Sequence, residues 1–387
     1  MTASADEPER VGWTDAEGRL QTARWRSLAG RSPPHSVVLV DDHLSTQTAW
    51  RSLNEGTALL WLGDFGNARH LLTALVRRLN RVRAAAPAED LHEAFERHRT
   101  QQARRAELLG GLLLPFDADH GVPLPRAPDV RLAGLEARGA VREHYVASLR
   151  ELLGLVGAHE WRRRGVPIAA LGGRIYPHHG VYSPVRGEYV DLVAEAPLPA
   201  AAVQHGAAEI GTGTGVLAAV LARRGLRVWA SDLSAAAVAC ASDNIARLQL
   251  ADRVTVVQAD LYATGVASQR YGLVICNPPW LPGPATSALD AAVYDPESRM
   301  LRGFLTGLEA HLCSGGEGWL ILSDLAEHLG LRSRDTLLRW IDEAGLRVLG
   351  RSDTRPRHRK AADRDDPLHE ARRAELTSLW RLGRAAD

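Results

Sequence analysis

Residues 207–215 read Ala-Ala-Glu-Ile-Gly-Thr-Gly-Thr-Gly, and this stretch decides the fold. The first four residues end a predicted strand, and from Val216 onward the chain continues as a predicted helix. The glycines between them permit a sharp turn, because glycine lacks a Cβ atom and tolerates positive φ. The helix that follows presents free N–H groups at its N-terminus. Since ligands of open α/β sheets bind at the carboxyl ends of the strands, the sequence predicts a ligand-binding loop here.

The pattern of this glycine loop (residues 211–215) excludes one common ligand class. A dinucleotide-binding loop follows Gly-x-Gly-x-x-Gly, but counted from Gly211 the last position holds Val216. The pattern that fits is acid-x-Gly-x-Gly-x-Gly, with Glu209 as the leading acid. An acid beside the loop suits a cationic ligand better than a phosphate-bearing one.

A second motif follows another apolar run. Residues 273–276 read Leu-Val-Ile-Cys, which predicts a buried strand, and Asn277-Pro278-Pro279-Trp280 comes directly after it. Proline fixes φ and has no N–H, so two in succession make a stiff loop with a preset carbonyl direction. The Asn277 side-chain oxygen and the Pro278 carbonyl could then accept both hydrogens of an exocyclic NH₂ group. Trp280 would stack on a flat substrate group; the alternative is a strand-ending loop whose Trp280 fills a core.

Together the two motifs resemble the class I S-adenosylmethionine (SAM) dependent methyltransferases of the small-domain, Asn-Pro-Pro-aromatic N-methyltransferase group. The resemblance covers about residues 170–387, with tryptophan where tyrosine is commoner in the family. It implies SAM as the cofactor and methyl transfer to a planar amino nitrogen. The implied catalytic residues are Asn277, Pro278, Pro279 and Trp280. The implied cofactor-binding residues are Glu209, Gly211, Thr212, Gly213, Gly215, Asp232, Leu233, Asp260, Leu261 and Asn277.

Two carboxylates in that set have structural alternatives. Asp232 follows the predicted strand 227–231, where a carboxylate can accept hydrogen bonds from ribose hydroxyls. Asp232 could instead cap the next helix, a task that Ser234 could also perform. For Asp260, after the third strand, the resemblance implies a place facing the adenine amino group, and an ordinary turn residue is the alternative.

The resemblance leaves the acceptor open. Three groups share the Asn-Pro-Pro-aromatic loop: RNA guanine-N2 enzymes, adenine-N6 enzymes, and glutamine methyltransferases that act on release factors. Residues 281–284, Leu-Pro-Gly-Pro, depart from the isoleucine that usually follows in the glutamine group. We therefore expect an RNA base, at guanine N2 or adenine N6, with a protein glutamine amide or a small-molecule amine as alternatives. A SAM- or RNA-binding protein without catalysis is a further alternative, against which the intact Asn277-Pro278-Pro279 loop argues.

The chain after residue 166 alternates short apolar runs with helical stretches, which predicts an α/β fold. We expect a methyltransferase domain at 166–387 with a doubly wound, mostly parallel seven-stranded sheet whose last strand is antiparallel. The predicted strands are 207–210, 227–231, 254–258, 271–276, 317–322, 346–350 and 376–381. The predicted helices are 215–224, 234–248, 297–312 and 333–344. The preceding stretch 172–184 is loosely similar to a segment before the core of ribosomal-RNA guanine methyltransferases, or is a joining hairpin.

Residues 1–165 predict a mostly helical accessory domain, which we expect to recognise the substrate. Apolar residues at helical spacing predict helices near 46–53, 68–82, 89–109 and 130–161. Residues 57–62 are too short a run to distinguish a strand from a helical turn. Prolines 115, 123, 125 and 128 predict a loop.

Composition limits the partners and the compartment. The 387 residues carry 47 basic and 46 acidic side chains, so no overall field demands nucleic acid or a membrane. Three distant cysteines predict no disulfide framework and no zinc site. With no leader pattern and no apolar run of about 20 residues, we expect a cytoplasmic protein without a membrane or metal partner. Basic stretches at 77–83, 97–105 and 351–360 could contact phosphates or be solvated faces.

Overall fold

The computed structural model describes residues 9–81, 90–184, 187–262, 269–285, 287, 289–357, 363 and 366–386. The chain forms two compact units, and each is described by itself. Unit 1 comprises residues 1–88 and 96–160, and unit 2 comprises residues 89–95 and 161–387. The end of the predicted basic loop, residues 358–360, lies outside the described residues.

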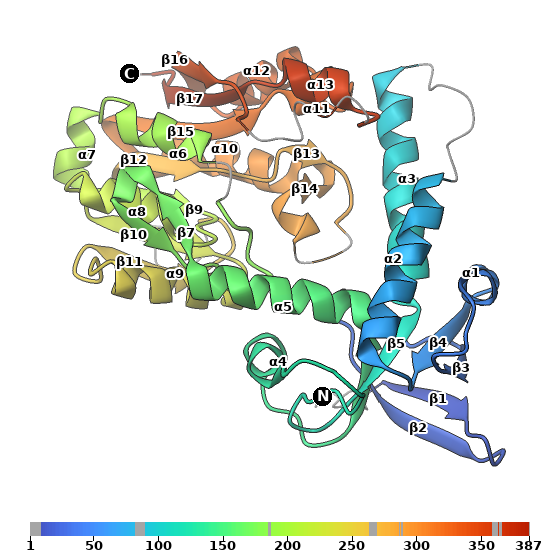
Figure 1. The fold of residues 1–387 in the computed structure, drawn as a ribbon. Helices are drawn as coiled ribbons and strands as arrows, with labels where there is room; N and C mark the ends of the chain where they lie inside the picture. The colour runs from blue at the N-terminus through green and yellow to red at the C-terminus, as the bar shows by residue number, and fades with distance from the viewer. Residues whose placement is uncertain are drawn as a thin grey trace, which may run out of the picture. The chain divides into compact units, whose positions relative to one another are not determined.

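Unit 2 is built on a seven-stranded sheet in the order β11-β10-β9-β12-β15-β17-β16 (Figure 1). Its strands are β9 (Ala207–Ile210), β10 (Val228–Asp232), β11 (Val254–Gln258), β12 (Tyr271–Cys276), β15 (Leu312–Ser323), β16 (Leu346–Thr354) and β17 (Thr377–Arg384). The first five strands in the sheet order pair in parallel, and β17 runs antiparallel to both of its neighbours. The predicted doubly wound sheet is confirmed, and β15 is longer than the sequence predicted.

Helices cover both faces of this sheet, because alternate residues of its central strands point to opposite cores. Leu273 and Ile275 of β12 belong to one buried cluster, whereas Val274 and Cys276 belong to another. The first core includes apolar side chains of α6 and α8, and the second includes those of α10 and α12. The helices of unit 2 are α6 (Glu188–Glu195), α7 (Ala200–His205), α8 (Val216–Arg223), α9 (Ala235–Arg247), α10 (Arg299–His311), α11 (Leu325–His328), α12 (Arg334–Glu343) and α13 (His369–Ala374).

Two small strand pairs complete unit 2. An antiparallel pair joins β7 (Val166–Ile168) to β8 (Gly173–Ile175), so the start of the stretch 172–184 forms the second strand of a hairpin. A parallel pair joins β13 (Leu281–Pro282) to β14 (Tyr294–Asp295) directly after the Asn-Pro-Pro-Trp motif. Short 3₁₀ turns occupy Ala169–Leu171, Asp290–Ala292 and Pro296–Ser298.

Unit 1 contains a six-stranded sheet in the order β1-β2-β6-β5-β4-β3. Its strands are β1 (Arg10–Thr14), β2 (Leu20–Trp25), β3 (Ser36–Val40), β4 (Thr57–Trp61), β5 (Leu112–Phe116) and β6 (Tyr145–Ser148). The helices are α1 (Thr46–Asn54), α2 (Phe65–Arg81), α3 (Leu91–Gly110), α4 (Arg131–Arg138) and α5 (Leu149–Arg164), and the chain passes between the units within α3 and α5. The expectation of a mostly helical N-terminal domain was therefore incomplete: the helices are present, but they pack on a mixed sheet.

Two strands explain why this sheet was not expected. Pro115 predicted a loop, yet it lies inside β5 opposite Val146 of β6. Proline is tolerated in a strand wherever the ladder does not need its missing N–H. The four residues of β6 are all buried, and their apolar run merged with the helical pattern of 130–161.

No helix among the described residues is both long enough and apolar enough to span a membrane.

Candidate active site

A cavity of about 500 Å³ lies at the carboxyl ends of β9, β10 and β12 in unit 2. The two motifs found in the sequence meet here, since both the glycine loop and the Asn-Pro-Pro-Trp loop line the cavity. The predicted site residues in its lining are Glu209, Gly211, Thr212, Gly213, Asp232, Leu233, Asp260, Leu261, Asn277, Pro278, Pro279 and Trp280.

The glycine loop turns sharply because its three glycines adopt left-handed backbone angles. The φ values are 76° at Gly211, 54° at Gly213 and 79° at Gly215, a region that side-chain-bearing residues occupy only at a cost. The N–H groups of Gly211 and Thr212 both donate to the Ser231 carbonyl at 2.8 Å, which ties the loop to β10. Gly215 is absent from the cavity lining and instead forms the N-cap of α8.

Glu209 is buried at the base of the loop, with 2% of its surface exposed. Its Oε2 accepts hydrogen bonds from the Thr212 hydroxyl at 2.6 Å and from the Ala218 N–H, in the first turn of α8, at 2.9 Å. Burial raises the pKa of Glu209 to about 8, although these two hydrogen bonds act in the opposite direction. Glu209 therefore holds the loop on the helix, and within the described residues its carboxyl group forms no ion pair.

Asp232 ends β10 and fixes the loop from the other side. Its Oδ2 accepts from the Gly213 N–H and its Oδ1 from the Ser234 N–H, each at 2.9 Å. Burial raises the pKa of Asp232 above its ordinary value. The N-cap of α9 is Ser234, whose hydroxyl accepts from the Ala237 N–H, so Asp232 is not needed for capping. Each Asp232 oxygen retains acceptor capacity for a ligand.

Asp260 lies in the cavity lining but is already paired. Its Oδ2 accepts from the Arg299 guanidinium at 2.5 Å, and both side chains are partly exposed. The next residue, Leu261, has a φ of 52° and also lines the cavity. Leu233 on the neighbouring strand end is 61% exposed. These two leucines give the cavity an apolar rim near the partnered carboxylate.

The Asn-Pro-Pro-Trp loop is fixed by contacts at its tryptophan. The Trp280 indole N–H donates to Asn277 Oδ1 at 2.9 Å, and the Trp280 carbonyl accepts from the buried Arg332 guanidinium at 3.4 Å. The Trp280 ring is half-buried and packs against both cores of unit 2. Because an indole N–H can only donate, this contact requires the Asn277 oxygen, not its NH₂, to face the ring.

One side of the cavity is formed by residues that the sequence did not single out. The segment between β16 and β17 carries α13 and contributes Arg372 and Glu375 to the lining. A buried apolar cluster that includes Leu281, Leu325 and Leu368 packs around α11 and α13. The only signal in the sequence was the length of this insertion before the last strand. The other lining residues not predicted include Tyr182, Tyr189, Tyr294, Arg299, Met300 and Leu325.

One histidine of the stretch 172–184 and the described part of the basic loop 351–360 fall outside the cavity lining. His178 contacts Asp243 on α9 at 3.2 Å and is not in the lining. In the described part of the loop 351–360, Arg351 pairs with Asp353 at 2.8 Å and Arg357 with Asp191 at 3.5 Å. The described residues contain no His, Cys, Asp and Glu group arranged to hold a metal ion.

Comparison with known proteins agrees with this geometry. The family described as "Methyltransferase small domain" matches residues 173–330. The chain is 37% identical over 117 residues to the release factor glutamine methyltransferase of Moorella thermoacetica, which covers 29% of this chain and 41% of that protein. It is 29% identical over 211 residues to the protein of the same name from Gloeobacter violaceus, covering 52% of this chain and 68% of that protein. It is also 33% identical over 88 residues to the tRNA1(Val) (adenine(37)-N6)-methyltransferase of Porphyromonas gingivalis, covering 21% of this chain and 34% of that protein.

Unit 2 thus contains a class I SAM-dependent methyltransferase domain of the small-domain type. Its Asn-Pro-Pro-aromatic loop follows β12, which is the fourth strand of the sheet in chain order. The chain matches less than half the length of the Moorella relative and about two thirds of the Gloeobacter relative.

Proposed function

We propose that this chain is a SAM-dependent N-methyltransferase that methylates a planar exocyclic NH₂ group. The observation that carries the proposal is that the glycine loop after β9 and the Asn-Pro-Pro-Trp loop after β12 line one cavity. A cofactor loop and an amine-accepting loop in the same cavity are what direct methyl transfer requires, because the two reacting groups must meet in line.

The lining fits SAM, which carries an ammonium, a sulfonium and a ribose. The glycine loop offers backbone with no Cβ in the way, and Asp232 retains acceptor capacity for the ribose hydroxyls. We assign the ammonium to the region of Glu209, because this carboxyl group lines the cavity and an ammonium beside it would favour its ionised form. Leu233 and Leu261 would contact the adenine, with Asp260 beside them.

Asn277 and Pro278 would bind the acceptor nitrogen. The lone pair of an amide or base amino group is delocalised, so it must be localised before it can attack. Two oxygens that accept both N–H groups favour a tetrahedral nitrogen whose lone pair is free. Bound SAM supplies an activated methyl group, so these residues need only orient the nitrogen, and its proton can leave after transfer.

We propose an RNA base as the acceptor, supported by Leu281 where the glutamine group usually has isoleucine, and by the relative named as a tRNA adenine-N6 methyltransferase. The second candidate is a glutamine amide in a protein, favoured by the relatives named as release factor glutamine methyltransferases. We propose that unit 1 recognises the acceptor in either case.

The acceptor class can be tested in cell extract with tritiated SAM. Extract labelled by the wild-type protein is divided and digested with ribonuclease or with protease before precipitation. An RNA acceptor predicts that ribonuclease removes the label, while label that survives ribonuclease and falls with protease would support the second candidate. SAM binding without label in any acceptor would contradict the methyltransferase proposal and favour a binding protein without catalysis.

A further inference from the structure

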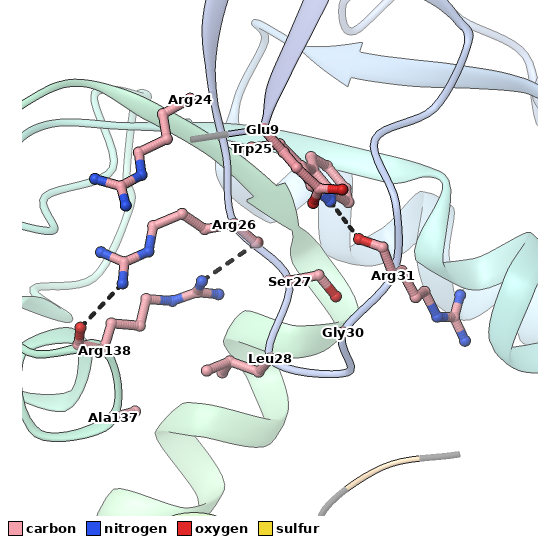
Figure 2. A pocket seen from close by; sticks show the side chains of 10 residues that line it. All are labelled: Glu9, Arg24, Trp25, Arg26, Ser27, Leu28, Gly30, Arg31, Ala137 and Arg138. Atoms are coloured by element: carbon pink, nitrogen blue, oxygen red, sulfur yellow. Dashed lines mark hydrogen bonds between the residues drawn. The ribbon is translucent and has the colours of Figure 1, made fainter. Parts of the chain in front are cut away.

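Unit 1 contains a second pocket, of about 330 Å³, that shares no lining residue with the cavity in unit 2. The pocket is lined by Glu9, which precedes β1, by residues of β2 and of the loop that follows it, and by the end of α4 (Figure 2). The lining residues are Glu9, Arg24, Trp25, Arg26, Ser27, Leu28, Gly30, Arg31, Ala137 and Arg138. We call this the arginine pocket, because four arginines and one carboxylate contribute to its lining.

Two of the arginines are held rigidly side by side. Arg26 Nη2 donates to the Arg138 carbonyl at 3.1 Å, and Arg138 Nη1 donates to the Arg26 carbonyl at 3.3 Å. Figure 2 shows these two side chains extending past one another, with the Arg24 guanidinium on the same side of the pocket. Arg31 differs, since its Nη1 donates to the Ala106 carbonyl at 2.7 Å. A fixed pair of guanidinium groups binds an anion without first losing side-chain freedom.

The positive charge of this pair is only weakly balanced. Arg138 has a side chain that is 2% exposed, and its carboxylate contact, to Glu151, is 3.4 Å long. Arg24 contacts Glu143 at 3.8 Å. Arg26 forms no ion pair within the described residues. Burial, together with the charges of Arg24 and Arg138, lowers its pKa. Neighbouring guanidinium groups that repel one another and have only long carboxylate contacts are stabilised when an anion binds.

The residue beneath the pair adds no negative charge. The guanidinium carbons of Arg26 and Arg138 lie 5.9 Å and 5.4 Å from the centre of the Tyr145 ring. Burial raises the pKa of Tyr145 to about 12, so its hydroxyl stays neutral and contacts His120 at 3.0 Å. The ring supports the two cations through its π face and leaves for a ligand those N–H groups that do not already donate to the backbone carbonyls or to Glu151.

We infer that the arginine pocket binds a phosphate group of the RNA acceptor, with Arg26 as its central ligand and Arg24 and Arg138 beside it. Guanidinium groups match phosphate oxygens in charge and in hydrogen-bond geometry. The inference rests on the proposed RNA methylation for the identity of the ligand. Unit 1 would then bind the RNA backbone, a role that the cavity of unit 2 does not provide.

The test measures binding of a fluorescein-labelled 20-nucleotide RNA of mixed sequence to the full chain by fluorescence anisotropy at several salt concentrations. Arg26→Gln should weaken binding about tenfold and reduce the salt dependence by about one phosphate contact. Arg26→Lys keeps the charge but not the two-pronged N–H geometry of the guanidinium group. Its RNA affinity should lie between those of Arg26→Gln and wild type. Arg69→Gln is the matched control, because Arg69 is an exposed arginine on α2 of the same unit; it should change binding by less than about twofold.

Equal weakening by Arg26→Gln and Arg69→Gln would overturn the inference, as would a wild-type chain that does not bind the RNA. A calorimetric titration with inorganic phosphate separates the two sources of phosphate. Arg26-dependent binding of inorganic phosphate without Arg26-dependent binding of RNA would also overturn it. The methyl-labelling experiment tests the proposed RNA methylation separately. Arg26-dependent RNA binding without RNA methylation would contradict the proposed function and leave the phosphate site standing.

Discussion

The indole N–H of Trp280 donates to the side-chain oxygen of Asn277 at 2.9 Å, within the loop that ends β12. The tryptophan of this chain therefore contacts the residue expected to bind the acceptor, in addition to offering a ring surface. An amide oxygen has two lone pairs, so Asn277 Oδ1 can keep this bond while accepting one from an acceptor NH₂ group. We interpret Trp280 as a residue that positions Asn277.

Replacing Trp280 with phenylalanine should separate the two roles of the tryptophan. An aromatic ring, smaller than the indole, is kept, but the N–H that orients Asn277 is lost, which costs about 1 kcal/mol if one net hydrogen bond is removed. We expect the rate of methyl incorporation at saturating SAM to fall about fivefold, with SAM affinity unchanged. Labelling rates with tritiated SAM and calorimetric SAM titrations measure both quantities, and an unchanged rate would show that the hydrogen bond has no positioning role.

The buried Glu209 should make the stability of unit 2 depend on pH. Its pKa is raised from an ordinary value of 4.5 to about 8 by burial. Between those two values the folded chain keeps the proton and the unfolded chain loses it, so the free energy of unfolding falls as pH rises through this window. Because glutamine does not titrate, the free energy of unfolding of Glu209→Gln should not fall in this way. Urea unfolding at pH 5, 7 and 9 should therefore favour the variant increasingly as pH rises, whereas a constant difference between the two proteins would refute the raised pKa.

Gly272 should be essential to the packing of the central sheet. A Cβ atom at this position of β12 would lie 2.1 Å from the carbonyl carbon of Ala201 and 2.2 Å from its oxygen, both backbone atoms of α7. Because neither backbone can give way easily, Gly272→Ala should destabilise the unit by about 3 kcal/mol or more. Gly350→Ala in β16 of the same sheet is the control, since nothing lies within 4 Å of its Cβ position. Thermal unfolding followed by circular dichroism should show a large drop in Tm for the first variant alone; equal Tm values would contradict the close approach of α7.

Much of unit 2 could be predicted from its sequence because local pattern and tertiary structure agree there. The strand 271–276 was predicted with its observed bounds, since an apolar run between turn signals is typical of a fully buried parallel strand. Unit 1 was harder, because β1 and β2 are short and partly polar, and β3 has no fully buried residue. Such strands exist only through their pairing partners, which a single sequence does not reveal.

The candidate site likewise contains residues that the sequence predicted and residues that it did not. Its residues next to strand ends, such as Asp232 and Asn277, were predicted because parallel strands bring their carboxyl ends to one edge. Arg372 was not predicted, because it reaches the cavity from an insertion whose path depends on tertiary packing around α11 and α13. Nor could the sequence show that Asp260 would pair with Arg299, which is distant in the chain.

The central claim is that one cavity holds a cofactor on one side and an amino nitrogen on the other. Calorimetric SAM titration of Asn277→Ala and Asp232→Ala, with methyl incorporation measured on the same preparations, tests it most directly. We expect Asn277→Ala to bind SAM nearly as well as wild type but to transfer no methyl group. We expect Asp232→Ala to lose at least about tenfold in SAM affinity, the effect of one charged hydrogen-bond partner. Equal loss of SAM affinity in both variants, or methyl transfer by Asn277→Ala at the wild-type rate, would contradict it.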